Sequence, residues 1–310
     1  MSVSTDSPNK SGQDPRVKWA LIAAGAVMAL FLVVVLAKWL RALPDVQEWL
    51  AAYPGHYELA ANAPVGLPAW LGWQHFLNAL MLILIIRSGW LVRTTARPKA
   101  FWTRNQGFIK TRNKPQKISL ELWFHLFVDG LWLLNGVIFV VLLFSTGQWM
   151  RIVPTSWEVF PNAVSAALQY ASLEWPHENG WVNYNSLQQL TYFVTVFLAA
   201  PAAMITGLRM SPAWPKGVAR LDRAFPVELA RAVHFPVMLY FVLFIISHVT
   251  LVFTTGALRN LNHMYGATDE DGWLGFWFFA ASLLVMIGCW LLARPLFLRP
   301  VASLMGRVSK

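Results

Sequence analysis

A long apolar stretch, residues 228–256, restricts how this chain can fold. It reads ELARAVHFPVMLYFVLFIISHVTLVFTTG and carries no charged side chain after Arg231. About 20 apolar helical residues are enough to cross the hydrocarbon core of a bilayer, and this stretch is longer than that. The sequence therefore predicts a membrane-spanning helix here.

The predicted helix carries two histidines, His234 and His248. Fourteen residues at about 100° each bring both side chains to within about 40° of the same helix face. At about 1.5 Å per residue they lie about 21 Å apart, one near each edge of the hydrocarbon layer. An imidazole without a partner is costly inside a membrane, so two on one face indicate a functional site. The alternative is that both are polar residues that hydrogen-bond between packed helices.

Composition extends the membrane prediction to the whole chain. It has 310 residues, of which 56% are hydrophobic and 13% charged, with a mean hydropathy of +0.47. Its 17 Trp residues suit a protein with many interfacial anchors. We expect an all-α integral membrane protein with six transmembrane helices in total, at residues 17–37, 67–86, 120–144, 187–208 (interrupted by Pro201), 230–253 and 273–293.

Four parts are predicted along the chain. Residues 1–16 form a polar, disordered tail, and 17–66 an extra transmembrane helix with an outside loop. Residues 67–260 contain a four-helix transmembrane bundle, and 261–310 the sixth helix with a cytoplasmic tail. The loop at 145–186 contains FPNAVSAALQYASLEW, which is expected to form an interfacial helix or a docking surface.

The basic residues predict the orientation. With the N-terminus in the cytoplasm, 21 of the 25 Lys and Arg residues fall on the cytoplasmic side. So lopsided a split predicts six helices with both termini inside. The net charge of +10 is therefore explained by topology, and nucleic acid is not an expected partner. The basic loop at 87–117 serves either to orient the chain or to dock an acidic partner or membrane lipid.

Four histidines in the predicted spans form two pairs at matching depths. His75 and His248 make an outer pair, and His125 and His234 make an inner pair. Paired imidazoles that project into a bundle core are the arrangement that holds haem b by two histidines. The sequence therefore predicts two haem b sites with these four residues as iron ligands. The other histidines, His56, His177 and His263, fall in outside loops.

Several neighbours of the histidines are candidates for supporting roles. Arg231, one turn before His234, can pair with a propionate of the inner haem, and Arg259 can do the same outside. Asp129, one turn after His125, can orient that ring or relay a proton. Small residues allow a macrocycle or a helix to approach closely, and here these are Gly130, Gly136 and Gly207. For each of these residues, ordinary packing or anchoring is the alternative.

Short motifs accompany the histidine pattern. The first bundle helix has His75-Phe76-Leu77-Asn78-Ala79 and ends in Ser88-Gly89. The segment before the third bundle helix has Tyr184, Asn185 and Gln188. With the two histidines fourteen apart, these residues resemble the di-haem b-type cytochrome subunits of formate dehydrogenase, nickel–iron hydrogenase and thiosulfate reductase complexes. The resemblance covers about residues 68–260, and Gly72 stands where that family usually has an arginine.

The resemblance implies a respiratory-chain function. It implies a four-helix haem-binding bundle with two haem b groups (iron protoporphyrin IX), to which this chain adds one N-terminal and one C-terminal transmembrane helix. It also implies a quinone, menaquinone or ubiquinone, bound near Tyr184, Asn185 and Gln188. The partner would be a catalytic redox subunit of molybdenum, nickel–iron or iron–sulfur type, and this chain would have no catalytic residues of its own.

Two other functions stay open at this point. One is a stand-alone haem b oxidoreductase that acts on superoxide, ferric iron or quinol. The other is a haem-free transporter that uses the buried histidines and Asp129 as a proton or metal relay. The single cysteine, Cys289, excludes an internal disulfide, a cysteine-rich metal site and covalent haem attachment.

Overall fold

Six long apolar helices dominate the computed structural model, which describes residues 14–105, 115–175, 179–215 and 217–310. Within these residues, the helices long and apolar enough to span a membrane are α1 (Pro15–Arg41), α3 (Ala69–Thr94), α4 (Leu120–Ser145), the continuous run of α6 (Ser186–Phe193), η2 (Val194–Ala199) and α7 (Ala200–Met210), α9 (Val227–Thr254) and α11 (Leu274–Leu292). The chain is an all-α, multi-pass membrane protein, as the sequence predicts. Predicted and observed span ends differ by up to eight residues, the most at the end of α3.

Shorter elements connect and cap the six helices. They are α2 (Pro44–Ala52), η1 (Gln148–Arg151), α5 (Val159–Ala171), α8 (Ala219–Ala224), α10 (Ala257–Leu261), η3 (Asn262–Gly266), α12 (Pro295–Met305) and the strands β1 (Phe101–Arg104), β2 (Lys117–Ser119) and β3 (Gly306–Ser309). The chain divides into two compact units. The N-terminal unit comprises Met1–Tyr57, Glu158–His177 and Asn185–Leu187, and the bundle unit comprises Glu58–Trp157, Glu178–Tyr184 and Gln188–Lys310.

The N-terminal unit contains α1, α2 and α5. Helix α1 begins at Pro15, where the Asp14 side chain accepts a hydrogen bond from the Arg16 amide at 2.9 Å. The predicted disordered tail of residues 1–16 was therefore too long at its end, and residues 1–13 lie outside the described part. The helix predicted in the long loop is present as α5. Trp49 of α2 donates to the hydroxyl of Ser165 on α5 at 3.0 Å.

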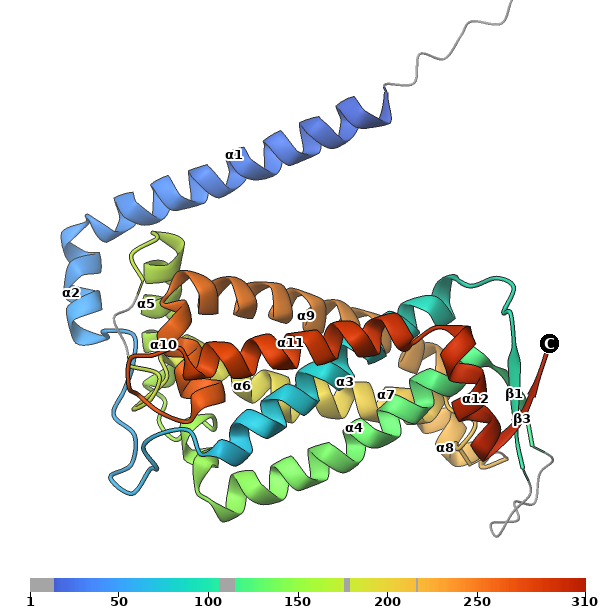
Figure 1. Cartoon of the computed structure of the whole chain (residues 1–310). Helices are drawn as coiled ribbons and strands as arrows, with labels where there is room; N and C mark the ends of the chain where they lie inside the picture. The colour runs from blue at the N-terminus through green and yellow to red at the C-terminus, as the bar shows by residue number, and fades with distance from the viewer. Residues whose placement is uncertain (1–13, 106–114, 176–178, 216) are drawn as a thin grey trace, which may run out of the picture. The chain divides into compact units, whose positions relative to one another are not determined.

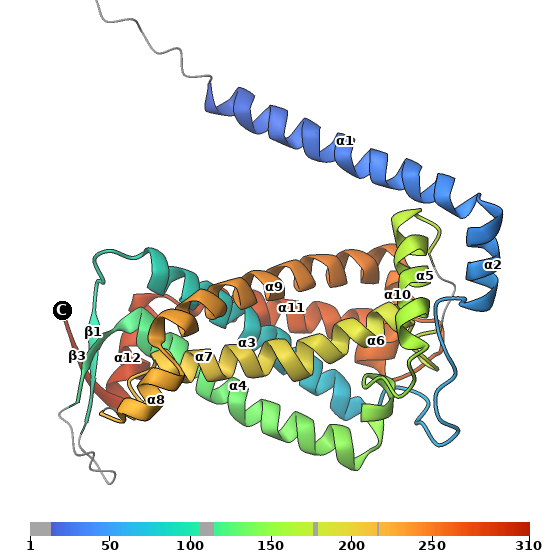
Figure 2. The ribbon, with the colours of Figure 1, turned by 180° about the vertical axis from the view of Figure 1, so that it is seen from behind.

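In the bundle unit the helices run side by side in two packed pairs (Figures 1 and 2). Helix α3 packs along α4, and α7 packs along α9. The three strands and α12 lie at one end of these helices, which we call the sheet end, and α10 lies at the other, which we call the loop end. The basic stretch at 87–117 lies at the sheet end, although its residues 106–114 are outside the described part.

A small sheet at the sheet end was not predicted. Its strand order is β2-β1-β3, all antiparallel, with Trp102 of β1 opposite Ile118 on one side and Val308 on the other. These three side chains pack against the core between α3 and α4, and the Trp102 indole donates to the Ala302 carbonyl at 3.0 Å. Strands of three or four residues, one of them about 200 residues away along the chain, leave too short a pattern to recognise in sequence.

The interruption predicted at Pro201 takes the form of a π-helix. Proline has no amide hydrogen, and its ring clashes with the carbonyl four residues earlier in a regular α-helix. The segment η2 ends at Ala199, two residues before this proline, and helix α7 begins at Ala200. A π-turn of this kind lets the helix continue with local rearrangement, so the span remains continuous across the membrane.

Candidate functional site

Two histidines meet near the loop end of the bundle. His75 lies in the second turn of α3 and His248 six residues before the end of α9. Their ring centroids are 6.0 Å apart and the ring planes are tilted by 50°. This is the outer pair of the sequence prediction, and we call it the loop-end pair.

A second pair lies near the sheet end. His125, in the second turn of α4, faces His234 of α9, with ring centroids 6.4 Å apart and planes at 83°. We call it the sheet-end pair. Metal–imidazole bonds are about 2.0–2.1 Å long, so two imidazoles on opposite sides of one ion have centroids roughly 6 Å apart. Both separations match that geometry.

Hydroxyl groups hold both rings of the sheet-end pair by their Nδ1 atoms. The Ser88 Oγ lies 2.9 Å from Nδ1 of His125, and the Thr206 Oγ1 lies 2.8 Å from Nδ1 of His234. Each hydroxyl donates its hydrogen to a carbonyl one turn back in its own helix, Leu84 at 2.8 Å and Ala202 at 2.5 Å. Because a carbonyl can only accept, both contacts of each hydroxyl are hydrogen bonds when the histidine donates from Nδ1, and in this tautomer Nε2 has a free lone pair. Ligating histidines are held in this way.

The loop-end pair is held differently. The hydroxyl of Tyr265 on η3 lies 3.2 Å from Nδ1 of His75, and the two rings are almost perpendicular. His248 stacks on Phe244 at 5.6 Å with planes at 8°, and it has no side-chain hydrogen bond among the described residues. The roles of Ser88, Thr206 and Tyr265 beside the histidines were not predicted from the sequence, because such contacts depend on how the helices pack.

A glycine allows η3 to reach His75. A Cβ atom on Gly72 of α3 would lie 2.5 Å from the backbone oxygen of Met264, the residue before Tyr265. The absence of a side chain at this position therefore lets η3 lie against α3 and places the tyrosine beside the histidine. This explains a small residue at 72, the position where the resembling family usually has an arginine.

Replacing Gly72 by alanine is expected to push η3 away from α3 and destabilise the loop end. Overpacking of this kind costs about 1–3 kcal/mol. The thermal midpoint of the detergent-solubilised protein, followed by tryptophan fluorescence, should fall. Gly288→Ala is the matched control, since nothing lies within 4 Å of a Cβ built there in α11. Equal midpoints for the two variants would contradict the packing argument.

Aromatic side chains lie between the two pairs along α9. Phe241 lies seven residues from each histidine of α9, is 4% exposed, and meets Trp132 of α4 at right angles with centroids 6.4 Å apart. Of the glycines expected to allow close approach, Gly207 lies beside His234, where a Cβ would be 3.5 Å from the ring. Apart from the local backbone of α4, no described atom lies within 4 Å of a Cβ built at Gly130 or Gly136. The space next to these two glycines is thus open in the described protein.

The charged residues predicted to support the histidine pairs differ in what they contact. Asp129 lies 3.6 Å from Nε2 of His125, whereas the group that bonds Nδ1 and orients the ring is Ser88. Arg259 forms an ion pair with Asp269 at 3.2 Å, so its guanidinium already has a carboxylate partner. Arg231 occupies an exposed position of α9 one turn before His234. Its predicted role at a propionate stays a prediction.

The three residues predicted to bind quinone lie where α6 begins. In the bundle unit, the Tyr184 ring lies 4.8 Å from the Arg151 guanidinium, and burial raises the pKa of its phenol. Gln188 is half-buried in the first turn of α6. In the N-terminal unit, Asn185 is fully buried and donates to the Tyr170 hydroxyl at 2.8 Å. A common pocket for these residues stays a prediction.

A buried arginine at the loop end was not singled out by the sequence analysis. Arg151 is 1% exposed and donates to the carbonyls of Gly66 at 2.7 Å and Gly180 at 2.6 Å. Gly66 has a φ of +87° and Trp181 against it, so only glycine suits this position. Among the loop histidines, His263 is buried and bonds Asp269 at 2.6 Å, His56 is exposed, and His177 lies outside the described residues.

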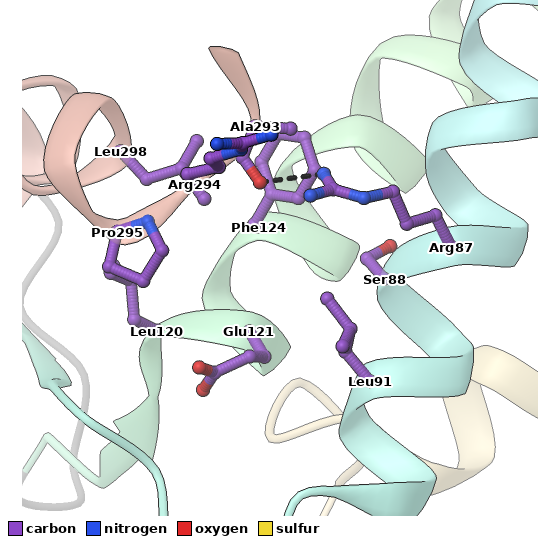
Figure 3. Close-up of a pocket in the computed structure, with 10 residues that line it drawn as sticks. All are labelled: Arg87, Ser88, Leu91, Leu120, Glu121, Phe124, Ala293, Arg294, Pro295 and Leu298. Carbon is purple, nitrogen blue, oxygen red and sulfur yellow. Dashed lines mark hydrogen bonds between the residues drawn. The ribbon is translucent and has the colours of Figure 1, made fainter. Parts of the chain in front are cut away.

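A small cavity lies at the sheet end between α3, α4 and the start of α12 (Figure 3). Ser88 lines it and links it to His125. Arg87 and Arg294 also line it, and Arg87 donates to the Ala293 carbonyl at 2.6 Å. The buried Oε2 of Glu121 has no hydrogen-bond partner in the described structure. The hydroxyl that holds His125 is thus adjacent to a cavity with charged walls.

No family model matches this chain. Searches of curated proteins and of solved structures give no match either. The functional assignment is therefore carried by the two histidine pairs and by the groups that hold them.

Proposed function

We propose that this chain is a membrane cytochrome b that holds two b haems and passes electrons between a redox partner and the quinone pool. The observation that carries the proposal is the pair of facing imidazoles at each end of the bundle, 6.0 and 6.4 Å apart. Two facing imidazoles could together hold one haem iron, and each of the two positions offers such a pair. The hydroxyl groups on Nδ1 of three of the four rings support the assignment, because they orient Nε2 toward the metal.

The residues of this chain have distinct roles in the proposal. His75, His125, His234 and His248 hold the iron atoms, and Ser88, Thr206 and Tyr265 hold three of those histidines in position. Helix α9 carries one ligand of each haem, so its rise of about 1.5 Å per residue fixes the two sites about 21 Å apart along its axis. The haems supply reversible one-electron chemistry, and the surrounding apolar helices exclude water from it.

The proposal extends to partners and orientation. The sheet end, with the basic residues of 87–117 and 294–310, would face the cytoplasm, and the membrane would be the bacterial inner membrane. Quinone would bind at the loop end near Tyr184, Asn185 and Gln188, and membrane lipid would surround the bundle. A separate catalytic redox subunit would exchange electrons with the other haem. The likeness of the histidine pattern to di-haem cytochrome subunits of respiratory complexes supports these assignments.

The test is a reduced-minus-oxidised absorption spectrum of the purified protein, with haem counted by the pyridine haemochrome assay. We expect the spectrum of b haems and two haems per chain. Turnover with superoxide, ferric iron or quinol by the isolated chain would favour the stand-alone oxidoreductase. A folded, monodisperse preparation that takes up no haem when haem is supplied during expression would refute the proposal and favour the transporter.

A further inference from the structure

The two histidine pairs differ in the hydrogen bonds made by their Nδ1 atoms. At the sheet end, both His125 and His234 donate from Nδ1 to an aliphatic hydroxyl, at 2.9 and 2.8 Å. Each hydroxyl in turn donates to a backbone carbonyl, and such chains polarise one another so that every bond in them is strengthened. Both rings of this pair are therefore hydrogen-bonded ligands.

At the loop end only one ring is held in this way, and less strongly. The Tyr265 hydroxyl lies 3.2 Å from Nδ1 of His75, and a phenol oxygen is a weaker acceptor than an aliphatic hydroxyl because its lone pair is shared with the ring. His248 has only the flat face of Phe244 beside it, 5.6 Å away.

A hydrogen bond at Nδ1 changes how strongly Nε2 of the same imidazole donates electrons to a metal. An imidazole that donates from Nδ1 carries more electron density on Nε2 and is a more basic ligand. A more basic axial ligand stabilises ferric over ferrous iron and so lowers the reduction potential, and second-layer hydrogen bonding is one of the means by which proteins set haem potentials.

We propose that Ser88 and Thr206 lower the reduction potential of the haem held by His125 and His234 below that of the haem held by His75 and His248. This inference rests on the proposed function. It makes electron transfer from the sheet end to the loop end the downhill direction. The redox partner would then deliver electrons at the sheet end, and the quinone near Tyr184 would receive them.

Nearby charges act in both directions. The Asp129 side chain lies 3.6 Å from Nε2 of His125, and in its ionised form it favours the ferric state at the sheet end. The guanidinium groups of Arg93 and Arg231 lie at exposed positions of the same end, where water and ions screen their positive charge. At the loop end Arg151 is buried, and no carboxylate pairs with it among the described residues. A buried positive charge at that end favours ferrous over ferric iron and so acts in the same direction as the unequal hydrogen bonding.

The experiment is a potentiometric titration of the purified protein with both haems bound. We expect two midpoints, which are assigned with His125→Ala and His75→Ala, since each should retain only the haem at the other end. Thr206→Val removes the acceptor without changing the shape of the side chain, and it should shift the lower midpoint upward and leave the upper one in place. Ser88→Ala should do the same, and Tyr265→Phe should raise only the upper midpoint.

Two variants separate this effect from a change in packing. Thr195→Val makes the same substitution in the same span at a hydroxyl that bonds Tyr240 instead of a histidine, and it should move neither midpoint. Thr206→Ser keeps the hydroxyl and should keep the wild-type value. Two haems with the sheet-end midpoint above the loop-end one would overturn the inference while the proposed function stands. An unchanged lower midpoint in Thr206→Val would also overturn the inference and leave the proposed function standing. A protein without haem would overturn both.

Discussion

His125→Ala and His234→Ala are each expected to remove one of two b haems, and the double variant is expected to remove no more than either alone. The reason is that both imidazoles face one position, 6.4 Å apart, so the loss of one ligand already empties that site. The same non-additivity is expected for His75 and His248, which are 6.0 Å apart. A double variant taken across the pairs, His125→Ala with His248→Ala, should remove both haems.

The measurement is haem per chain by the pyridine assay on monodisperse protein. His56→Ala is the control, because this exposed histidine lies in the loop before α3 and should leave two haems bound. Equal haem loss from every pairwise double variant would mean that the four histidines act as one site, contrary to the pairing. Retention of two haems in any of the four single variants would show that the replaced residue is not a ligand.

Much of this arrangement could be read from the sequence because a membrane restricts the possible structures. The length of an apolar run shows which residues cross the bilayer. The position of a histidine along that run then shows its depth in the membrane. Depth alone was enough to match His75 with His248 and His125 with His234, and the ring distances agree with that matching.

The groups that hold the rings could not be predicted in the same way. Ser88 and Thr206 are ordinary polar residues of apolar helices, and their closeness to a histidine depends on the rotation of one helix against another. Tyr265 reaches His75 from a π-helical turn that lies against Gly72, which no periodic pattern encodes. The sheet that joins β3 to β1 also depends on contacts between distant segments.

Replacing Arg151 by alanine is expected to be among the most destabilising single changes in the bundle unit. The guanidinium is buried and bridges the carbonyls of Gly66 and Gly180, two segments that are more than a hundred residues apart. Removing it takes the guanidinium donor from the Gly180 carbonyl, leaves the Gly66 carbonyl only its bond from Gln148, and opens a cavity, which together cost about 3 kcal/mol or more. Arg151→Lys should recover only part of the loss, since one ammonium group cannot reproduce the planar fork that reaches both carbonyls.

The thermal midpoint of the purified protein measures this, with Arg259→Ala as the matched control. Arg259 is also at the loop end, but its ion pair with Asp269 is exposed, and exposed pairs contribute little to stability. We therefore expect a large fall in midpoint for Arg151→Ala, a smaller one for Arg151→Lys and almost none for Arg259→Ala. Equal thermal midpoints for Arg151→Ala and Arg259→Ala would contradict this expectation. They would mean that the guanidinium bonds to the two carbonyls contribute little to stability. The loop end would then be held by the packing of Trp181 on Gly66 instead of by this bridge.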